Sequence, residues 1–156
     1  MPDFPRAEIE ATHDRYLQAR AGIEAGELGW EALADFFTED ATFIDPAWGR
    51  VDGRDGIRRF MRESMAGLDD WTFPHLWRVI EGNRIVAAWW NRLPGQRADG
   101  SHYEALGVSI ITYAGNGRFS WEEDLLNMVH VFELMKESRW KPTGAVNAPP
   151  SPPRRR

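Results

Sequence analysis

The spacing of hydrophobic residues changes near the middle of the chain, at about Trp71. Before this point apolar side chains recur every three or four residues, which is the spacing of one face of a helix. After it they alternate with polar side chains, which is typical of strands that bury one face. Helices followed by consecutive strands favour an α+β fold. We predict helices at about 6–25, 30–37 and 53–67, and then strands at about 71–81, 84–93, 101–114 and 118–128.

A short additional strand is predicted between the second and third helices. Residues 41–45 are β-prone and stop at Pro46, a residue that central strands exclude. Two turn signals, Gly82-Asn83 and residues 115–117, join the later strands as hairpins, with a longer connection over 94–100. Hairpins pair strands antiparallel, so we expect an antiparallel sheet.

The chain has the size and composition of one domain. Its 156 residues include 42% hydrophobic side chains, enough for one substantial core. We place a single domain at 1–139. Residues 140–156 are rich in proline and end in three arginines, so we predict a disordered tail there.

Charge and composition weigh against several classes of partner. The chain has 19 basic and 24 acidic residues, and a net charge of −5 gives no reason to expect nucleic acid or an anionic membrane as a partner. No apolar run approaches the roughly 20 residues of a membrane span, and the first residues lack a basic start with an apolar segment. We therefore expect a soluble, cytoplasmic protein. With no cysteine, any catalysis depends on oxygen or nitrogen groups.

Asp45 is the first candidate for a catalytic base. Side chains alternate along a strand, so Phe43 and Asp45 share one face of the segment 41–45. A carboxylate beside aromatic groups is desolvated, which raises its pKa and makes it a better base. The alternative is that Asp45 caps the turn that begins at Pro46.

The last predicted strand carries three acids in succession. Alternation separates Glu123, which shares a face with Trp121, from Glu122 and Asp124 on the other face. One of these two sets faces the interior, and spacing alone does not decide which. A solvated edge is the alternative for all three.

The phrase FFTEDATFIDP at 36–46 and the phrase RYLQAR at 15–20 resemble the nuclear-transport-factor-2-like superfamily. This superfamily includes SnoaL-like cyclases, ketosteroid isomerases, dehydratases and limonene-epoxide hydrolases, and the resemblance covers about residues 8–136. It implies a strongly curved sheet wrapped around the long first helix. Such a sheet forms a cone-shaped α+β barrel with an open mouth and an apolar pocket.

The resemblance to ketosteroid isomerases implies roles for two residues. Asp45 falls on the position of the aspartate that shuttles the proton, and Tyr16 on that of the tyrosine that binds the oxyanion. The alternative for Tyr16 is a core tyrosine whose hydroxyl is satisfied locally. The chain departs from the isomerases in placing Ser109 where their neutral aspartic acid is expected.

The resemblance to limonene-epoxide hydrolases concerns the last strand. In those enzymes an aspartate follows a tryptophan by two residues, a position that falls on Glu123. This implies that Glu123 is an auxiliary acid or positions water. The Arg and Asp pair of an earlier strand in those enzymes has no matching carboxylate in AAWWNRLPG at 87–95.

Aromatic residues are plentiful, with eight tryptophans in the chain. We expect several of them to line the pocket, although core packing or a dimer contact explains them as well. The residues predicted to bind substrate are Phe43, Trp48, Phe60, Trp90, Asn91 and Ser109.

No motif indicates a metal or a cofactor. The four histidines show no close metal-binding pair, and the chain lacks the glycine-rich phosphate loops and the nucleophile elbow of α/β hydrolases. The resemblance then implies a cofactor-independent SnoaL-like enzyme that uses acid and base steps on a hydrophobic small molecule, which is steroid-, terpenoid- or polyketide-like. The rival expectation is a non-catalytic binding or scaffold module. The broad sheet and the resemblance also favour a homodimer formed through the sheet.

Overall fold

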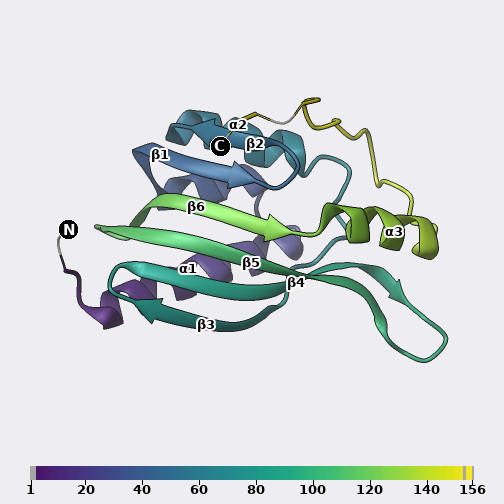
Figure 1. Cartoon of the computed structure of the whole chain (residues 1–156), viewed down its shortest axis with the longest axis horizontal. Helices are drawn as coiled ribbons and strands as arrows, with labels where there is room; N and C mark the ends of the chain where they lie inside the picture. Colours follow the sequence, from purple (N-terminus) through teal and green to yellow (C-terminus); the bar gives the residue numbers. More distant parts are fainter. Residues whose placement is uncertain (1–2, 153, 156) are drawn as a thin grey trace.

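A computed structural model describes residues 3–152, 154 and 155, and it confirms the predicted α+β class (Figure 1). The elements in chain order are α1 (Arg6–Glu24), the 3-10 helix η1 (Trp30–Phe36), β1 (Phe37–Asp45), β2 (Gly49–Asp52), α2 (Arg54–Ser64), β3 (His75–Glu81), β4 (Arg84–Gln96), β5 (His102–Gly115), β6 (Arg118–Leu126) and α3 (Met128–Ser138). None of the helices in these described residues is long and apolar enough to cross a membrane.

The sheet of the described residues has six strands in the order β2-β1-β6-β5-β4-β3. The predicted hairpins β3-β4, β4-β5 and β5-β6 are antiparallel, but β1 runs parallel to β6. The prediction of a wholly antiparallel sheet was therefore wrong. Strands β2 and β3 are the two edge strands and do not pair with each other, so the cone is an open curved sheet rather than a closed barrel. The β1-β6 pairing is non-local, and no turn signal announces it.

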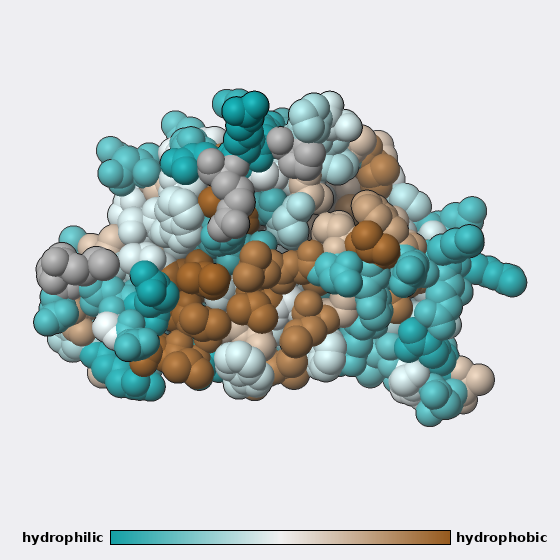
Figure 2. Space-filling model, in the orientation of Figure 1, coloured by the Kyte–Doolittle hydropathy of each residue, from teal (hydrophilic) through white to brown (hydrophobic). Residues whose placement is uncertain are grey.

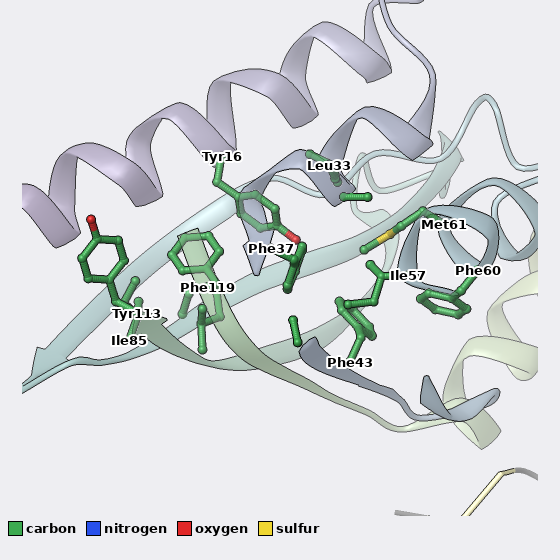
Figure 3. Packing of buried hydrophobic residues seen from close by; sticks show 14 of the residues in the cluster. Tyr16, Leu33, Phe37, Phe43, Ile57, Phe60, Met61, Ile85, Tyr113 and Phe119 are labelled. Carbon is green, nitrogen blue, oxygen red and sulfur yellow. The ribbon is translucent and has the colours of Figure 1, made fainter. Parts of the chain in front are cut away.

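Helix α1 lies across the concave face of the sheet (Figure 1). Its buried side chains include Ile9, Tyr16 and Ile23, which pack with sheet residues such as Phe37 and Phe119 in the main core. Figure 3 shows Tyr16 reaching from α1 toward these two rings. Burial of these large apolar groups is the main contribution to holding helix and sheet together.

The turn between β5 and β6 confirms the glycine-asparagine prediction. Asn116 and Gly117, the two residues between the paired Gly115 and Arg118, have φ of 54° and 68°. Positive φ at both central positions is the geometry of a tight two-residue hairpin, and asparagine and glycine adopt it most readily.

Helix α3 was not predicted. Its start is capped by Asn127, whose side chain accepts a hydrogen bond from the backbone N–H of His130 at 3.2 Å. Val131 and Leu134 bury one face of the helix in a second core cluster with Trp71 and Leu93. An asparagine cap followed by apolar residues three apart is the sequence signal for this helix.

The C-terminal segment after Trp140 runs back from α3 toward α2 (Figure 1). Residues 141–150 form no helix or strand, yet they contact the end of α2 and the turn that follows it. The N–H of Thr143 donates to Gly67 O at 2.9 Å, and the Asn147 side chain donates to Glu63 O at 3.0 Å. The disorder expected for this tail stays a prediction.

Candidate active site

A cavity of about 480 Å³ lies between the concave face of the sheet, α1, α2, α3 and the C-terminal segment. Its walls are mostly apolar, and many of them are aromatic. The aromatic lining residues are Tyr16, Trp30, Phe43, Trp48, Phe60, Trp71, Phe73, Trp89, Phe132 and Trp140. Concave, largely apolar cavities with a few polar groups are the usual form of small-molecule sites.

Tyr16 and Glu122 form one polar contact of the cavity wall. The Tyr16 hydroxyl donates to Glu122 Oε2 at 2.9 Å, and the two residues are only 4% and 3% exposed. Burial raises the pKa of Tyr16 well above its ordinary value, and the nearby carboxylate of Glu122 raises it further. Tyr16 therefore remains protonated and can act as the donor in this pair.

A second polar chain ends on Asp124. The indole N–H of Trp89 donates to Ser109 Oγ at 2.9 Å, and Ser109 Oγ donates to Asp124 Oδ1 at 2.5 Å. An indole nitrogen can only donate, so the hydroxyl hydrogen of Ser109 is directed to Asp124. This arrangement fixes the orientation of the Asp124 carboxyl group at the cavity wall.

Glu122 and Asp124 point to the same side of β6 and interact directly. Burial raises the pKa of Glu122 to about 7, although Tyr16 and Arg20 favour its charged form. Burial also raises the pKa of Asp124 well above its ordinary value, and the charge of Glu122 adds to this effect. Two close buried carboxyl groups cannot both ionise readily, so the pair retains a proton at neutral pH.

Asp45 lies at the end of β1 and lines the same cavity as Phe43, as the alternation predicted. Its Oδ1 also accepts hydrogen bonds from the backbone N–H groups of Ala47 and Trp48, at 2.8 and 2.7 Å. Asp45 thus caps the turn and faces the cavity at once. Burial raises its pKa, while the two N–H groups act in the opposite direction.

Glu123, which the resemblance implies as an auxiliary acid or water-positioning residue, does not line the pocket. Glu122 and Asp124 line the cavity, whereas Glu123 lies on the other face of β6. The cause is a bulge at Ser120. Phe119 pairs with Tyr113 and Trp121 pairs with Thr112, so two steps along β6 match a single step along β5. Phe119 is fully buried, so plain alternation from it would place residues 121 and 123 inside. The extra residue reverses the two faces.

Trp90 was also misplaced. Trp89 lines the cavity, and its neighbour Trp90 lies on the outer face of the sheet. A run of two tryptophans gives no signal for which one faces inward, because alternation assigns opposite faces to both. The other predicted residues line the cavity as expected, namely Tyr16, Phe43, Asp45, Trp48, Phe60, Asn91 and Ser109.

Arg20 is a cavity residue that the sequence patterns did not single out. It lies one helical turn after Tyr16 on α1, so the i, i+4 spacing on one helix face was the available signal. Its charge acts on Tyr16, Glu122 and Asp124. This cation favours ionisation of the acid pair and partly offsets its burial.

Histidine takes part in a separate cluster between α1 and β3. The Nδ1 atom of buried His13 lies 3.1 Å from Nη1 of Arg78, and the His75 ring packs edge-on against it. Burial and the charge of Arg78 lower the pKa of His13 to about 3. Within the part of the chain that the structure describes, no group of three or more His, Cys, Asp or Glu residues could hold a metal ion.

Comparison with known proteins identifies both the sequence family and the fold. Residues 14–121 match the family model described as a SnoaL-like domain. A search of curated proteins finds no match. The protein resembles a putative SnoaL-like polyketide cyclase from Jannaschia sp. CCS1, with 15% identity over 86% of this chain and 96% of the other, at a TM-score of 0.63.

Two further solved structures share the fold. TerC, co-crystallised with polyporic acid, is 20% identical over 83% of this chain and 98% of the other, with a TM-score of 0.57. A de novo designed protein with a curved β-sheet is 10% identical over 87% of this chain and 98% of the other, with a TM-score of 0.60. At these identities the structural likeness shows the fold alone.

Proposed function

The chain belongs to the family of SnoaL-like domains, and from this premise we propose that it is a cofactor-independent enzyme that acts by acid–base chemistry on a hydrophobic small molecule. The reactions that fit are isomerisation, cyclisation, dehydration and hydration. The single observation that carries the proposal is the convergence of three carboxyl groups with raised pKa, those of Asp45, Glu122 and Asp124, on one apolar cavity. Clusters of this kind are typical of catalytic sites.

Asp45 is the proposed base. Its Oδ1 is held by two backbone N–H groups, which leaves Oδ2 to accept a proton from a carbon acid or from water. A raised pKa brings the carboxylate closer to the basicity that such a transfer needs. Its charge also raises the pKa of Asp124, so ionised Asp45 helps to keep that acid neutral.

The Glu122 and Asp124 pair is the proposed acid. When Asp45 removes a proton next to a carbonyl, negative charge develops on the carbonyl oxygen. The proton retained by the pair can be donated to that oxygen as a hydrogen bond or transferred to it, and then returned as Asp45 gives its proton back. A neutral carboxylic acid in an apolar site is a strong donor for this purpose.

This arrangement revises two predictions that came from the ketosteroid isomerases. The Tyr16 hydroxyl is committed to Glu122, so we assign Tyr16 to positioning that acid instead of contacting the oxyanion directly. Ser109 stands where the isomerases are expected to have a neutral aspartic acid. We assign that role to Asp124 on the adjacent strand, which pairs with Ser109 in the β5-β6 ladder and accepts its hydrogen bond.

The cavity determines the proposed class of substrate. Its volume of about 480 Å³ lies within the roughly 300–1,000 Å³ of small-molecule pockets, and its aromatic walls suit a planar or polycyclic molecule. Steroid-, terpenoid- or polyketide-like skeletons meet both conditions. TerC, which has the same fold, was co-crystallised with polyporic acid.

A second candidate function is a non-catalytic ligand-binding or scaffold module. The observation that favours it is the turn-capping role of Asp45, which alone would explain an aspartate at this position. The shared fold of a designed protein also shows that this architecture can form without a natural activity. In a binding module the three carboxyl groups would contribute no proton transfer.

Solvent deuterium exchange distinguishes the two functions even while the natural substrate is unidentified. A panel of steroid, terpenoid and polyketide-like ketones is incubated with the protein in deuterium oxide, and exchange next to the carbonyl is followed by NMR. We expect one ketone class to exchange, with a rate lowered about 10²–10⁴-fold by Asp45→Asn. Asparagine keeps an oxygen acceptor for the turn, so this variant should fold.

The matched control for the acid pair lies on the same strand. Glu122→Gln should reduce the exchange rate, whereas Glu123→Gln makes the same chemical change on the other face of β6 and should leave it unchanged. Ketones that bind without any catalysed exchange, or a folded Asp45→Asn variant with full activity, would overturn the enzyme proposal in favour of a binding module.

A further inference from the structure

Arg20 occupies a position on the inward face of α1 where an apolar residue is expected. The buried residues of this helix include Ile9, His13, Tyr16 and Ile23, which recur every three or four positions. Arg20 belongs to the same series, since it lies between Tyr16 and Ile23 at this spacing. Figure 3 shows that Tyr16 points from α1 toward the sheet, and the Arg20 side chain leaves the helix on the same face. Packing alone does not explain a charged residue in this series.

No contact within the part of the chain that the structure describes neutralises Arg20. None of the hydrogen bonds and ion pairs among these residues involves its guanidinium group. Arg78, by contrast, is paired with Asp14. Arg20 is only partly exposed and lines the cavity described above. Among the described lining residues it is the one cation.

The guanidinium group of Arg20 lies on the side of the cavity away from Asp45. Its charge opposes the rise that burial causes in the pKa of Glu122 on β6, and it adds to the lowering that burial causes in the pKa of His75 on β3. Burial and two backbone N–H groups account for the pKa of Asp45, with no contribution from Arg20. In the sheet order β2-β1-β6-β5-β4-β3, the strand of Asp45 is next to that of Glu122, and three strands separate it from that of His75. Arg20 therefore lies over the middle strands, beyond the acid pair as seen from Asp45.

The nearby acids are committed to other partners. Glu122 Oε2 accepts from the Tyr16 hydroxyl at 2.9 Å. Asp124 Oδ1 accepts from the Ser109 hydroxyl at 2.5 Å. Turning either carboxyl group toward Arg20 would break a buried hydrogen bond, which is unfavourable. The cavity thus keeps a cation that its own acids do not contact.

A bound ligand must satisfy this cation. Before a ligand binds, water can hydrate the partly exposed guanidinium group of Arg20. An apolar ligand that fills the cavity displaces this water, and arginine cannot release its proton to avoid the resulting desolvation penalty. The ligand must therefore bring an acceptor. A carboxylate is the best match, because its two oxygens accept two parallel hydrogen bonds from the planar guanidinium group.

We propose that Arg20 binds a carboxylate group of the substrate, on the side of the cavity opposite Asp45. The inference rests on the proposed function, because it names the class of substrate for the same cavity. The acid pair lies between Arg20 and Asp45, so the reacting carbonyl group falls in the middle of the ligand. The proton that the pair retains limits its repulsion of the bound anion. The substrate class is an apolar, aromatic or polycyclic keto acid, which Arg20 holds while Asp45 acts on the carbon next to the carbonyl.

Two probes of the same shape and different charge test the inference. 2-Naphthoate carries a carboxylate where 2-naphthamide carries a neutral amide, and isothermal titration calorimetry at neutral pH measures both affinities. We expect the wild type to bind naphthoate about 10-fold more tightly than the amide, as a charge-assisted hydrogen bond provides. Arg20→Met keeps a flexible stem without the charge. It should reduce this preference to about 2-fold or less, while the affinity for the amide changes by less than about 3-fold.

A matched control lies on the outward side of the same helix. Arg15 is exposed and is not among the residues that line the cavity, so Arg15→Met removes the same charge from α1 and should leave the preference intact. Loss of Arg20 should also raise the pKa of Glu122, because this cation favours the charged form of the acid. The acid pair then becomes less negative, which by itself would strengthen the binding of an anion. A preference lost in Arg20→Met therefore reports a direct contact.

A second variant keeps the charge. Arg20→Lys retains the cation without the planar fork, so we expect a preference between those of the wild type and Arg20→Met. Equal binding of both probes by the wild type, or no binding of naphthoate at millimolar concentration, would overturn the inference. So would an Arg20→Met variant that keeps the preference or weakens both probes equally, or an Arg15→Met variant that loses the preference to the same extent.

This test is separate from the test of catalysis. If the enzyme proposal fails and Arg20 binds carboxylates, the preference for naphthoate persists while no ketone exchanges deuterium. If the enzyme proposal is correct and Arg20 binds no carboxylate, exchange proceeds while the two probes bind equally. Each proposal thus has its own measured quantity.

Discussion

The hydroxyl group of Tyr16 donates to Oε2 of Glu122 over 2.9 Å and joins α1 to β6 across 106 positions of sequence. This contact links the long helix to the strand that carries the acid pair, so substitutions at its two ends should affect both stability and titration.

Replacing Tyr16 with phenylalanine removes the donor and leaves a buried carboxyl group without it. We expect Tyr16→Phe to lower the free energy of unfolding by about 1–3 kcal/mol, measured by urea denaturation. The pKa of Glu122 should rise further, because the lost hydrogen bond favours its charged form. Tyr103→Phe, at a partly exposed tyrosine packed on Arg97, is the matched control. Equal stability of the two variants would contradict the role of the Tyr16 contact.

The stability that Glu122 contributes should fall as the pH rises through its titration. Its pKa is raised from 4.5 to about 7 in the folded protein, so between these values the folded state holds a proton that the unfolded chain has lost. The contribution of Glu122 to the free energy of unfolding then decreases from about pH 4.5 and levels off above pH 7, with a total change on the order of 3 kcal/mol. Buried His13, whose pKa is lowered to about 3, acts in the opposite direction below pH 6.5, and Asp124, whose pKa is raised, acts in the same direction as Glu122. Urea denaturation of the wild type and of Glu122→Gln between pH 4.5 and 8 measures this contribution as the difference between their slopes.

Two variants check the assignment of this pH dependence. Glu122→Gln should remove the Glu122 contribution, because glutamine does not titrate and still accepts from Tyr16, and leave the contributions of His13 and Asp124. Asp52→Asn should leave the pH dependence in place, since Arg50 and Thr42 lower the pKa of Asp52 and move its titration below this window. Equal slopes in the wild type and in Glu122→Gln would contradict the assignment to Glu122.

Gly67 allows the C-terminal segment to lie close to the end of α2. A Cβ atom at Gly67 would come within 2.6 Å of Val146 Cγ1 and 2.9 Å of Gly144 O, and its φ is +81°. We expect Gly67→Ala to detach residues 141–149, so that the Thr143 amide, which donates to Gly67 O, exchanges at least about 10-fold faster with deuterium. Gly100→Ala is the matched control, because Gly100 has φ of +85° and no atom near its Cβ position. Equal exchange in both variants would attribute the effect to backbone strain alone.

The outer face of the sheet is the proposed homodimer interface. Figure 2 shows a hydrophobic area over the strands of the sheet, and Trp77, Val79, Leu106 and Leu125 are each between 48% and 57% exposed there. Exposed apolar areas of this kind are typical of protein interfaces. We expect Val79→Glu or Leu125→Glu to raise the dimer dissociation constant at least about 10-fold in sedimentation velocity. Leu28→Glu, a similarly exposed leucine outside the sheet, should not, and a wild-type protein that stays monomeric would contradict the interface.

Local signals predicted the elements whose partners are close in sequence. The apolar spacing of 6–25 predicted α1, observed at Arg6–Glu24, and the turn signals predicted the hairpins, because a helix face or a two-residue turn is encoded within a few positions. The predicted direction of Phe43 and Asp45 was correct for the same reason.

Non-local pairing explains most of what the sequence did not reveal. The bulge at Ser120 depends on how β6 matches β5, and it decided that Glu122 and Asp124 face the cavity instead of Glu123. No residue type near Ser120 predicts a bulge. A bulge is defined by how one strand pairs with its partner, and that pairing is not encoded near Ser120 in the sequence. The parallel pairing of β1 with β6 is of the same kind.

The C-terminal segment that forms one wall of the cavity belongs to the same chain as the site. The cavity lining includes residues of this segment, namely Pro142, Val146, Asn147, Ala148 and Pro149. Because the segment is tethered, it competes with a long ligand for the same space at a constant effective concentration, commonly in the millimolar range for short tethers. A ligand that fits beside this wall binds without displacing it, whereas a longer ligand must first overcome its attachment. The length and stiffness of residues 141–145 can therefore tune the upper size limit of the ligand without altering any group that meets it.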